Sequence, residues 1–265
     1  MSHFKTVEIA DNQFVRDKLY FMTVKSQNLK GRGDISFYLP DSEKKDLPLV
    51  ILLHGVYGSS WSWAYSGGAH ITTQEMIDKG LIPEVILAMP SDGLHGDGTG
   101  YVNHGKRDFE KWIVEDVVAA TKVLTKQFSK KSKVYICGLS MGGFGAIRLG
   151  AKHNEFFSGI SAHSSATEFS LLDQFMEGEV WSQLDPGLDD YSPIYWLKKH
   201  KDNLPPLRFD CGLDDFLLDG NRKLHEQLKE ENIEHIYEEF PGEHTWDYWQ
   251  LHLKDSLKFL LGKPK

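Results

Sequence analysis

The chain has 265 residues, of which 40% are hydrophobic and 26% are charged, a balance that is typical of a folded globular protein and argues against a mainly disordered one. A chain of this length buries about 70–75% of its unfolded surface on folding, so its core needs no disulfide bonds. With 30 Lys and Arg against 38 Asp and Glu, the formal net charge is −8, which argues against a basic surface for nucleic acid or anionic membranes.

The first residues and the cysteines indicate a compartment. The start of the chain has no apolar signal core, and no apolar run approaches the ~20 residues of a membrane-spanning helix. Cys137 and Cys211 both lie in apolar runs, which predicts two buried thiols. We therefore expect a cytoplasmic protein, although a chain from which a secretion signal had been removed would begin in the same way.

Eight runs along the chain have the character of β-strands. The first two, 20–24 and 35–39, have little between them and predict an antiparallel hairpin at one edge of a sheet. Runs without polar alternation follow, and these are typical of a parallel sheet that helices cover on both faces. The apolar runs are 49–53, 85–89, 134–137 and 159–162, and two further candidates are 207–211 and 235–240.

Helical patterns fall between these strands. Apolar residues recur at helical spacing over 109–128, 142–152, 221–231 and 246–261. The alternation predicts an α/β sandwich with a mostly parallel central sheet, as a single domain over residues 1–265.

One segment, 164–206, breaks the alternation. It is long for a connection and rich in aromatic residues and proline. We expect it to be a small cap-like insertion whose short helices lie over one end of the sheet. The alternative is a side excursion that packs only on the body of the domain.

The sharpest motif is the sequence GLSMGG at 138–143, between the strand 134–137 and a helix that starts at Gly142. A G-x-S-x-G sequence in this setting is typical of a nucleophile elbow, in which a strained turn carries the serine, here Ser140, off the edge of the sheet. Glycines on either side let the strand and the helix approach closely. The backbone N–H of Met141 is then available to stabilise an oxyanion.

A nucleophilic serine needs a base, and the base needs a carboxylate that orients it. His244 follows the strand 235–240, and Asp214 and Asp215 follow the strand 207–211. The order Ser, Asp, His, each at a strand end, is that of α/β-hydrolases. We predict that His244 is the base and that Asp215 orients it, because the spacing from Gly212 selects the second of the two adjacent carboxylates.

The loop after the strand 49–53 supplies the candidates for a second oxyanion donor. It reads HGVYG at 54–58, and its glycines permit a tight turn. The N–H of Val56 is the first candidate and that of Tyr57 the second, while His54 is expected to brace the loop. Tyr57, Trp63 and Trp181 are expected to line the substrate pocket.

The loop 91–100 is rich in Asp and Gly, and His104 follows it. It matches neither the EF-hand spacing nor H-E-x-x-H, and the chain has no phosphate-binding or dinucleotide-binding fingerprint. We therefore predict no metal and no cofactor.

Together, these motifs resemble the esterase D-like family of α/β-hydrolases, nearest to its tributyrin, feruloyl and enterochelin esterase-like branches. The resemblance spans about 20–261. It implies a triad of Ser140, Asp215 and His244, with the N–H groups of Val56 and Met141 as the oxyanion hole. The motifs that carry it are His54-Gly55-x-x-Gly58 with Trp63, Gly138–Gly143, Cys211-Gly212-x-x-Asp215 and Pro241-Gly242-x-His244-x-Trp246.

The predicted function is that of a serine carboxylesterase, which hydrolyses short-chain acyl esters or acetyl and feruloyl-type esters of sugars and aromatic acids through an acyl-enzyme. One alternative is an acyltransferase to an alcohol or sugar acceptor. Another is a non-catalytic binding protein of the hydrolase fold, which is disfavoured because all three triad positions are filled. The expected partner is a small-molecule ester, with neither nucleic acid nor membrane; whether the chain forms a homo-oligomer is left open.

Overall fold

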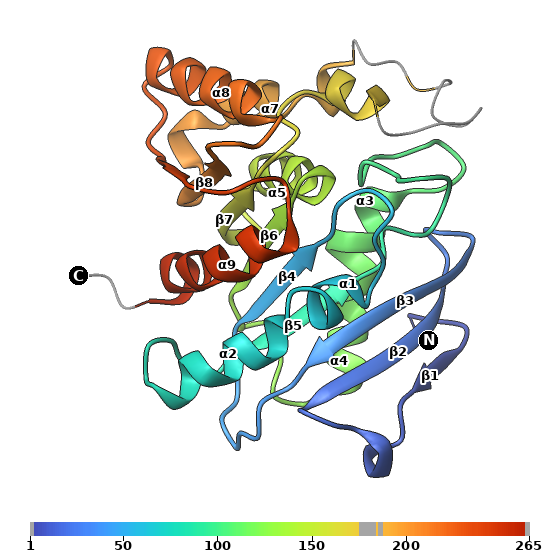
Figure 1. Cartoon of the computed structure of the whole chain (residues 1–265). Coiled ribbons are helices and arrows are strands. Elements are labelled where there is room, and N and C mark those ends of the chain that lie inside the picture. The colour runs from blue at the N-terminus through green and yellow to red at the C-terminus, as the bar shows by residue number, and fades with distance from the viewer. Residues whose placement is uncertain (1–2, 175–183, 185–187, 263–265) are drawn as a thin grey trace.

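The computed structural model describes residues 3–174, 184 and 188–262 (Figure 1). Within these residues the centre of the molecule is a nine-stranded sheet in the order β1-β2-β3-β5-β4-β6-β7-β8-β9. The strands are β1 (Val7–Ile9), β2 (Leu19–Ser26), β3 (Gly31–Tyr38), β4 (Leu49–Leu53), β5 (Ile86–Pro90), β6 (Val134–Leu139), β7 (Phe157–His163), β8 (Leu207–Gly212) and β9 (Ile236–Phe240). All eight predicted strands are therefore present, and β1 is an addition to them.

The strands from β5 to β9 are mutually parallel, as predicted. On the other side, β2 pairs antiparallel with both β1 and β3, and β3 pairs antiparallel with β5. The predicted hairpin is thus confirmed, but it lies one strand in from the edge, because the three-residue β1 pairs outside it. The sequence offered no clear signal for so short a strand.

The helices form two layers, one on each face of the sheet. Their bounds are α1 (Ser62–Tyr65), α2 (Ala69–Asp78), α3 (Phe109–Lys111), α4 (Val118–Leu124), α5 (Met141–Lys152), α7 (Pro193–Lys199), α8 (Leu218–Glu230) and α9 (Trp246–Leu261), and the π-helical segment η2 (Trp112–Val117) joins α3 to α4. No helix in this described part is long and apolar enough to span a bilayer.

Alternate residues of β4 show how the core is divided. Leu49, Ile51 and Leu53 belong to one hydrophobic cluster, together with residues of α3, η2, α4, α5 and α8. Val50 and Leu52 belong to a second cluster, with residues of α1, α2 and α9. Both faces of the sheet are therefore covered, which explains why the central strands are apolar throughout (Figure 1). The two predicted buried cysteines also lie in this core as free thiols.

The segment 164–206 contains short helices, as expected: η3 (Phe169–Gln174), η4 (Asp189–Tyr191), α7 and η5 (Lys201–Asn203). An ion-pair network joins it to α5, in which Arg148 donates to the Asp190 carbonyl at 2.6 Å and to its carboxylate at 2.9 Å. Lys152 of α5 joins the same carboxylate at 2.6 Å. None of the described residues of this segment lines the pocket around Ser140. The described residues of the segment pack on α5, and the cap over the end of the sheet stays a prediction.

Candidate active site

Ser140 lies at the turn between β6 and α5, with a φ of 55° and a ψ of −120°. A positive φ is unusual for a residue other than glycine and stores strain in the turn. The turn is also crowded: a Cβ at Gly138 would lie 2.1 Å from the carbonyl oxygen of Gly142, and one at Gly142 would lie 2.3 Å from that of Leu53. Side chains are therefore excluded at these two positions, which explains the G-x-S-x-G spacing.

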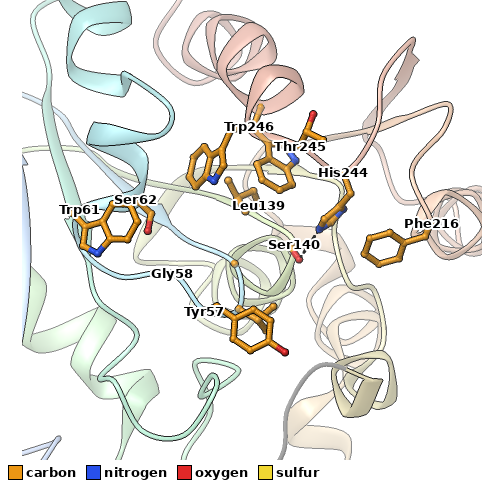
Figure 2. A pocket seen from close by; sticks show the side chains of 13 residues that line it. Tyr57, Gly58, Trp61, Ser62, Leu139, Ser140, Phe216, His244, Thr245 and Trp246 are labelled. Carbon is orange, nitrogen blue, oxygen red and sulfur yellow. Dashed lines mark hydrogen bonds between the residues drawn. The ribbon is translucent and has the colours of Figure 1, made fainter.

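The structure brings together the three residues that the sequence selected. The Nε2 atom of His244 lies 3.0 Å from the Oγ of Ser140, and its Nδ1 lies 2.8 Å from an Oδ atom of Asp215. Figure 2 shows the imidazole of His244 pointing at Ser140 on the floor of a pocket. Because an ionised carboxylate only accepts hydrogen bonds, Nδ1 carries the proton and Nε2 is free to accept the serine hydroxyl.

Asp215 is fixed from two sides in a buried position. One carboxylate oxygen accepts the hydrogen bond from His244, and the other accepts the N–H of Leu217 at 2.8 Å. Burial raises the pKa of the Asp215 carboxyl, but the hydrogen bond and charge of His244 outweigh it, so the pKa lies below its ordinary value. Asp214, the adjacent candidate, is exposed, and its backbone N–H donates to Gly242. Asp215 is thus the carboxylate that faces the imidazole.

The loop 54–58 lies directly against the serine. A Cβ at Gly55 would lie 3.0 Å from the Cδ1 of Leu139 and 3.1 Å from the Cβ of Ser140, so a side chain there would crowd the nucleophile. The N–H of Tyr57, the second candidate for an oxyanion donor, already donates to the carbonyl of Asp97 at 3.2 Å. The N–H groups of Val56 and Met141 make no hydrogen bond to another described residue. These two groups are therefore available to a ligand beside Ser140.

His54 braces this loop from below, as the sequence indicated. Its Nδ1 donates to the Gly55 carbonyl at 2.7 Å, and its Nε2 accepts the backbone N–H of Asp92 at 3.0 Å. The carbonyl of His54 accepts the hydroxyl of Tyr101 at 2.9 Å. Burial lowers the pKa of the imidazole. A neutral His54 suits both of its hydrogen bonds, which hold the oxyanion loop to the loop 91–100.

The pocket above Ser140 has a volume of about 590 Å³. Its inner wall includes the buried side chains of Leu139 and Trp249 and the half-buried Trp246, and its mouth includes the exposed side chains of Tyr57, Trp61 and Phe216 (Figure 2). The pocket is thus enclosed on one side, open on the other, and mostly aromatic.

One predicted pocket residue needs correction. Trp63 is only 1% exposed and does not line the pocket. Its indole N–H donates to the carbonyl of Leu53 at 3.0 Å, and its ring packs edge-on against Trp246 at 5.6 Å. Trp63 therefore supports the wall from behind, and Trp61, two residues earlier, reaches the pocket instead. Tyr57 lines the pocket as predicted, whereas Trp181 lies outside the described residues.

Sequence reasoning did not single out Phe216 and Trp249 as pocket residues. Phe216 follows Asp215 directly, and Trp249 lies in the first turn of α9, five residues after His244. An aromatic residue beside a predicted catalytic residue is the signal that could have identified them. Their rings contact the imidazole of His244, with centroid distances of 4.4 and 4.9 Å.

A second serine–histidine–aspartate arrangement lies under the site. Ser256 is 2.8 Å from the Nε2 of His163, and the Nδ1 of His163 is 2.8 Å from the carboxylate of Asp210. All three side chains are fully buried and none lines the pocket. Asp210 also accepts hydrogen bonds from Arg208 and Tyr248, so the network ties β7, β8 and α9 together. A substrate cannot reach it, and its role is structural.

The loop 91–100 is organised by its own polar groups. The carboxylate of Asp92 accepts the backbone N–H groups of Leu94 at 2.9 Å and Thr99 at 2.8 Å. Among the residues that the structure describes, no group of three or more His, Cys, Asp and Glu side chains could hold a metal ion. The loop shapes the region beside the oxyanion loop.

Comparison with known proteins places this geometry in a family. The sequence is 29% identical over 238 residues to an acetyl esterase from Caldicellulosiruptor saccharolyticus, which covers 83% of this chain and 85% of the relative. Among solved structures, a ferulic acid esterase superposes with a TM-score of 0.81 at 22% identity, covering 96% of this chain and 98% of the other. The Staphylococcus aureus fluorophosphonate-binding serine hydrolase FphF superposes with a TM-score of 0.78 at 21% identity, covering 91% and 97%.

The two structural similarities establish the fold, an α/β-hydrolase with antiparallel strands at one edge. The family profile described as "Putative esterase" matches residues 26–260, which is most of the chain. The chain therefore belongs to this esterase family and is a carboxylic ester hydrolase.

Proposed function

We propose that the chain hydrolyses esters of short acyl groups through a covalent acyl-enzyme on Ser140, with His244 as the base and Asp215 as the orienting carboxylate. The observation that carries this proposal is the pair of hydrogen bonds of 3.0 and 2.8 Å that join the three side chains at the floor of an open pocket. A serine hydroxyl on a strained turn, a neutral imidazole and a buried carboxylate are the parts that nucleophilic catalysis needs.

The reaction follows from these positions. His244 takes the proton of Ser140 as the Oγ attacks the ester carbonyl carbon. The carbonyl oxygen becomes an oxyanion and accepts hydrogen bonds from the N–H groups of Val56 and Met141. His244 then gives its proton to the leaving alcohol oxygen, and the acyl-enzyme remains. Water enters, loses a proton to His244 and attacks the acyl carbon. The bond between that carbon and the Oγ of Ser140 then breaks, and the Oγ takes the proton from His244 as the carboxylic acid leaves.

The pocket supports a preference for small acyl groups. Its inner wall is formed by Leu139, Trp246 and Trp249, whose rings and chains are held by neighbouring side chains. A packed aromatic wall cannot widen without disturbing the core, and overpacking is costly. We expect acyl chains of about two to four carbons to be cleaved faster than chains of about twelve. The acetyl esterase among the similar proteins suggests the acetyl group as a candidate, and the ferulic acid esterase suggests the larger feruloyl group as the alternative that the ester panel tests.

The test combines covalent labelling with an ester panel. A fluorophosphonate probe should label the native protein and fail to label Ser140→Ala. The panel contains 4-nitrophenyl acetate, butyrate and dodecanoate, with methyl ferulate beside them. No labelling and no hydrolysis of any ester would favour the non-catalytic binding protein. Faster cleavage of the dodecanoate, or activation at an oil–water interface, would refute the short-acyl preference.

A further inference from the structure

The segment 163–166, at the end of β7, is bonded to the turn that carries Ser140. The N–H of Ser140 donates to the carbonyl of His163 at 3.0 Å, and the carbonyl of Ser140 accepts the N–H of Ala166 at 3.2 Å. Between these two bonds, the N–H of Ser164 donates to the carbonyl of Asp210 at 2.8 Å. The backbone of this segment therefore stands in a fixed register with the backbone of Ser140.

Ser164 is held in an unusual conformation within this segment. It has a φ of 47° and is fully buried. A positive φ is unfavourable for a residue other than glycine, and such strain persists only where the surrounding structure holds the residue in place. Strained residues of this kind cluster at functional sites, so the contacts of the Ser164 hydroxyl are of interest.

The first contact of this hydroxyl is with an aromatic residue beside His244. The Oγ of Ser164 accepts the indole N–H of Trp249 at 3.2 Å. Trp249 is 6% exposed, and its ring stands at 90° to the imidazole of His244, with a centroid distance of 4.9 Å. The hydrogen bond to Ser164 therefore fixes the position of a ring that lies against the imidazole.

The second contact is with the carboxylate of Asp215. Because an indole N–H is only a donor, the Oγ of Ser164 accepts from Trp249 and its own proton is free to be donated. Burial raises the pKa of the Asp215 carboxyl, but hydrogen bonding from His244 and, to a smaller extent, from the Ser164 hydroxyl holds the pKa below its ordinary value. Burial also raises the pKa of the neighbouring Cys211 thiol, which is therefore neutral and a weaker acceptor than the carboxylate.

Both partners of the hydroxyl contact His244. The ring of Trp249 lies against the imidazole, and Asp215 accepts a hydrogen bond from its Nδ1 at 2.8 Å. A displacement of either partner changes the direction of the Nε2 atom, which lies 3.0 Å from the Oγ of Ser140. A serine that only satisfied a buried indole would stabilise the fold, whereas this hydroxyl joins the two groups that orient the base.

We propose, on the basis of the proposed function, that Ser164 is a positioning residue of the triad. Its Oγ accepts from Trp249 and donates to Asp215, and these two side chains hold the imidazole of His244 toward Ser140. Loss of the hydroxyl leaves the indole N–H without this partner and removes one donor from the carboxylate. The imidazole then adopts orientations in which Nε2 points away from the nucleophile. A misplacement of about 1 Å can cost about 100-fold in rate.

The first experiment measures the hydrolysis of ethyl acetate, an unactivated ester for which acylation should limit the rate, so that KM reports binding. Ser164→Ala should lower kcat by about 10- to 100-fold and leave KM near the native value. Ser164→Gly also removes the hydroxyl but relieves the strain of the positive φ, so it should fold readily and lose kcat to a similar extent. A native kcat in a folded Ser164→Ala or Ser164→Gly variant would overturn the role of Ser164.

Ser165→Ala is the matched control. Ser165 is fully buried, like Ser164, and its Oγ has no hydrogen-bond partner among the residues that the structure describes. Its backbone carbonyl, which accepts the side-chain N–H of Asn221 at 3.0 Å, is retained in the variant. Both kcat and KM should stay at their native values. An equal fall of kcat in Ser165→Ala and Ser164→Ala would reveal a general effect of the segment and overturn the proposal.

The second experiment tests the link through Trp249. Trp249→Phe keeps an aromatic ring beside His244 and removes the indole N–H. If the hydroxyl acts partly through this ring, Ser164→Ala should lower kcat by a smaller factor in the Trp249→Phe background than in the native one. The same factor in both backgrounds would overturn the link.

The time course of fluorophosphonate labelling is followed beside both experiments. Ser164→Ala should be labelled more slowly than the native protein but to completion, because Ser140 is present and only the base that activates it is misplaced. Labelling at the native rate would overturn the role of Ser164 and leave the proposed function standing. A native protein that is neither labelled nor active on ethyl acetate would overturn the proposed function, and the role of Ser164 with it.

Discussion

Replacing Asp215 by Asn tests how His244 is held. In the native protein both carboxylate oxygens accept hydrogen bonds, one from the Nδ1–H of His244 and the other from the N–H of Leu217, each at 2.8 Å. Asparagine has only one oxygen. If this oxygen keeps the bond to Leu217, the amide NH₂ faces Nδ1, and the imidazole must move its proton to Nε2. The protonated Nε2 then points at Ser140 and cannot accept the hydroxyl proton.

The other orientation of the amide is less stable. It keeps the bond to His244 but turns the NH₂ group toward the N–H of Leu217, which leaves two buried donors facing each other. An unsatisfied buried donor costs about 1–3 kcal/mol, so the first orientation should dominate. The wrong tautomer then removes the base. We expect kcat to fall by about four orders of magnitude, as for a triad in which the same change was made. This corresponds to about 5–6 kcal/mol of transition-state stabilisation.

The assay is the kcat for 4-nitrophenyl acetate at saturation, with thermal unfolding to show that the variant folds. Asp214→Asn is the matched control, because its side chain is exposed and its backbone N–H keeps the bond to Gly242. The control should stay near the native kcat. A loss smaller than tenfold in Asp215→Asn, or a larger loss in Asp214→Asn, would refute the assigned role of Asp215.

Three further predictions concern the nucleophile and two buried charges. Ser140→Ala should fold normally by circular dichroism, yet lose fluorophosphonate labelling and about 10⁶ in kcat. Burial lowers the pKa of His163, but the Asp210 carboxylate outweighs it and raises the pKa to about 9. Protonated His163 should therefore contribute its full stabilisation of the fold below about pH 6.5 and lose it as the pH rises through about 9. The expected loss is about 3 kcal/mol in the free energy of unfolding measured in urea, and His163→Gln should not show it. Arg148→Met removes one partner of the buried Glu110, which keeps Lys152 at 3.0 Å and His153 at 2.9 Å, and should lower the free energy of unfolding by about 1–3 kcal/mol in the same assay.

The chemistry of the site could be predicted from the sequence because its signals are local. A strand, a crowded turn and a helix must follow one another for Ser140 to be presented, and the glycines that permit the turn can be identified directly in the sequence. The parallel order of the strands then brings the later strand ends to the same edge of the sheet. For that reason, Asp215 and His244 could be selected from their places after two strands, and the structure brings both to Ser140.

Helix α2 (Ala69–Asp78) was not among the helices predicted from the sequence, and it shows where local patterns fail. Its inward face carries the buried polar residues His70 and Thr73, whereas the apolar Ile71 is exposed. The stripe that predicts an amphipathic helix is therefore absent. Contacts with α9, distant in sequence, decide which face of α2 is covered.

The sequence by itself determined the layered α/β fold and the three residues that meet at the turn, because strand burial and the elbow depend on neighbours along the chain. Only the tertiary structure decided the walls of the pocket. Trp61 and Trp63 are two residues apart, yet one reaches the pocket and the other supports it from behind. Phe216 gains its place beside His244 because two separate loops converge. Exposure and contact of this kind depend on segments far apart in the chain, and residue type and spacing do not encode them.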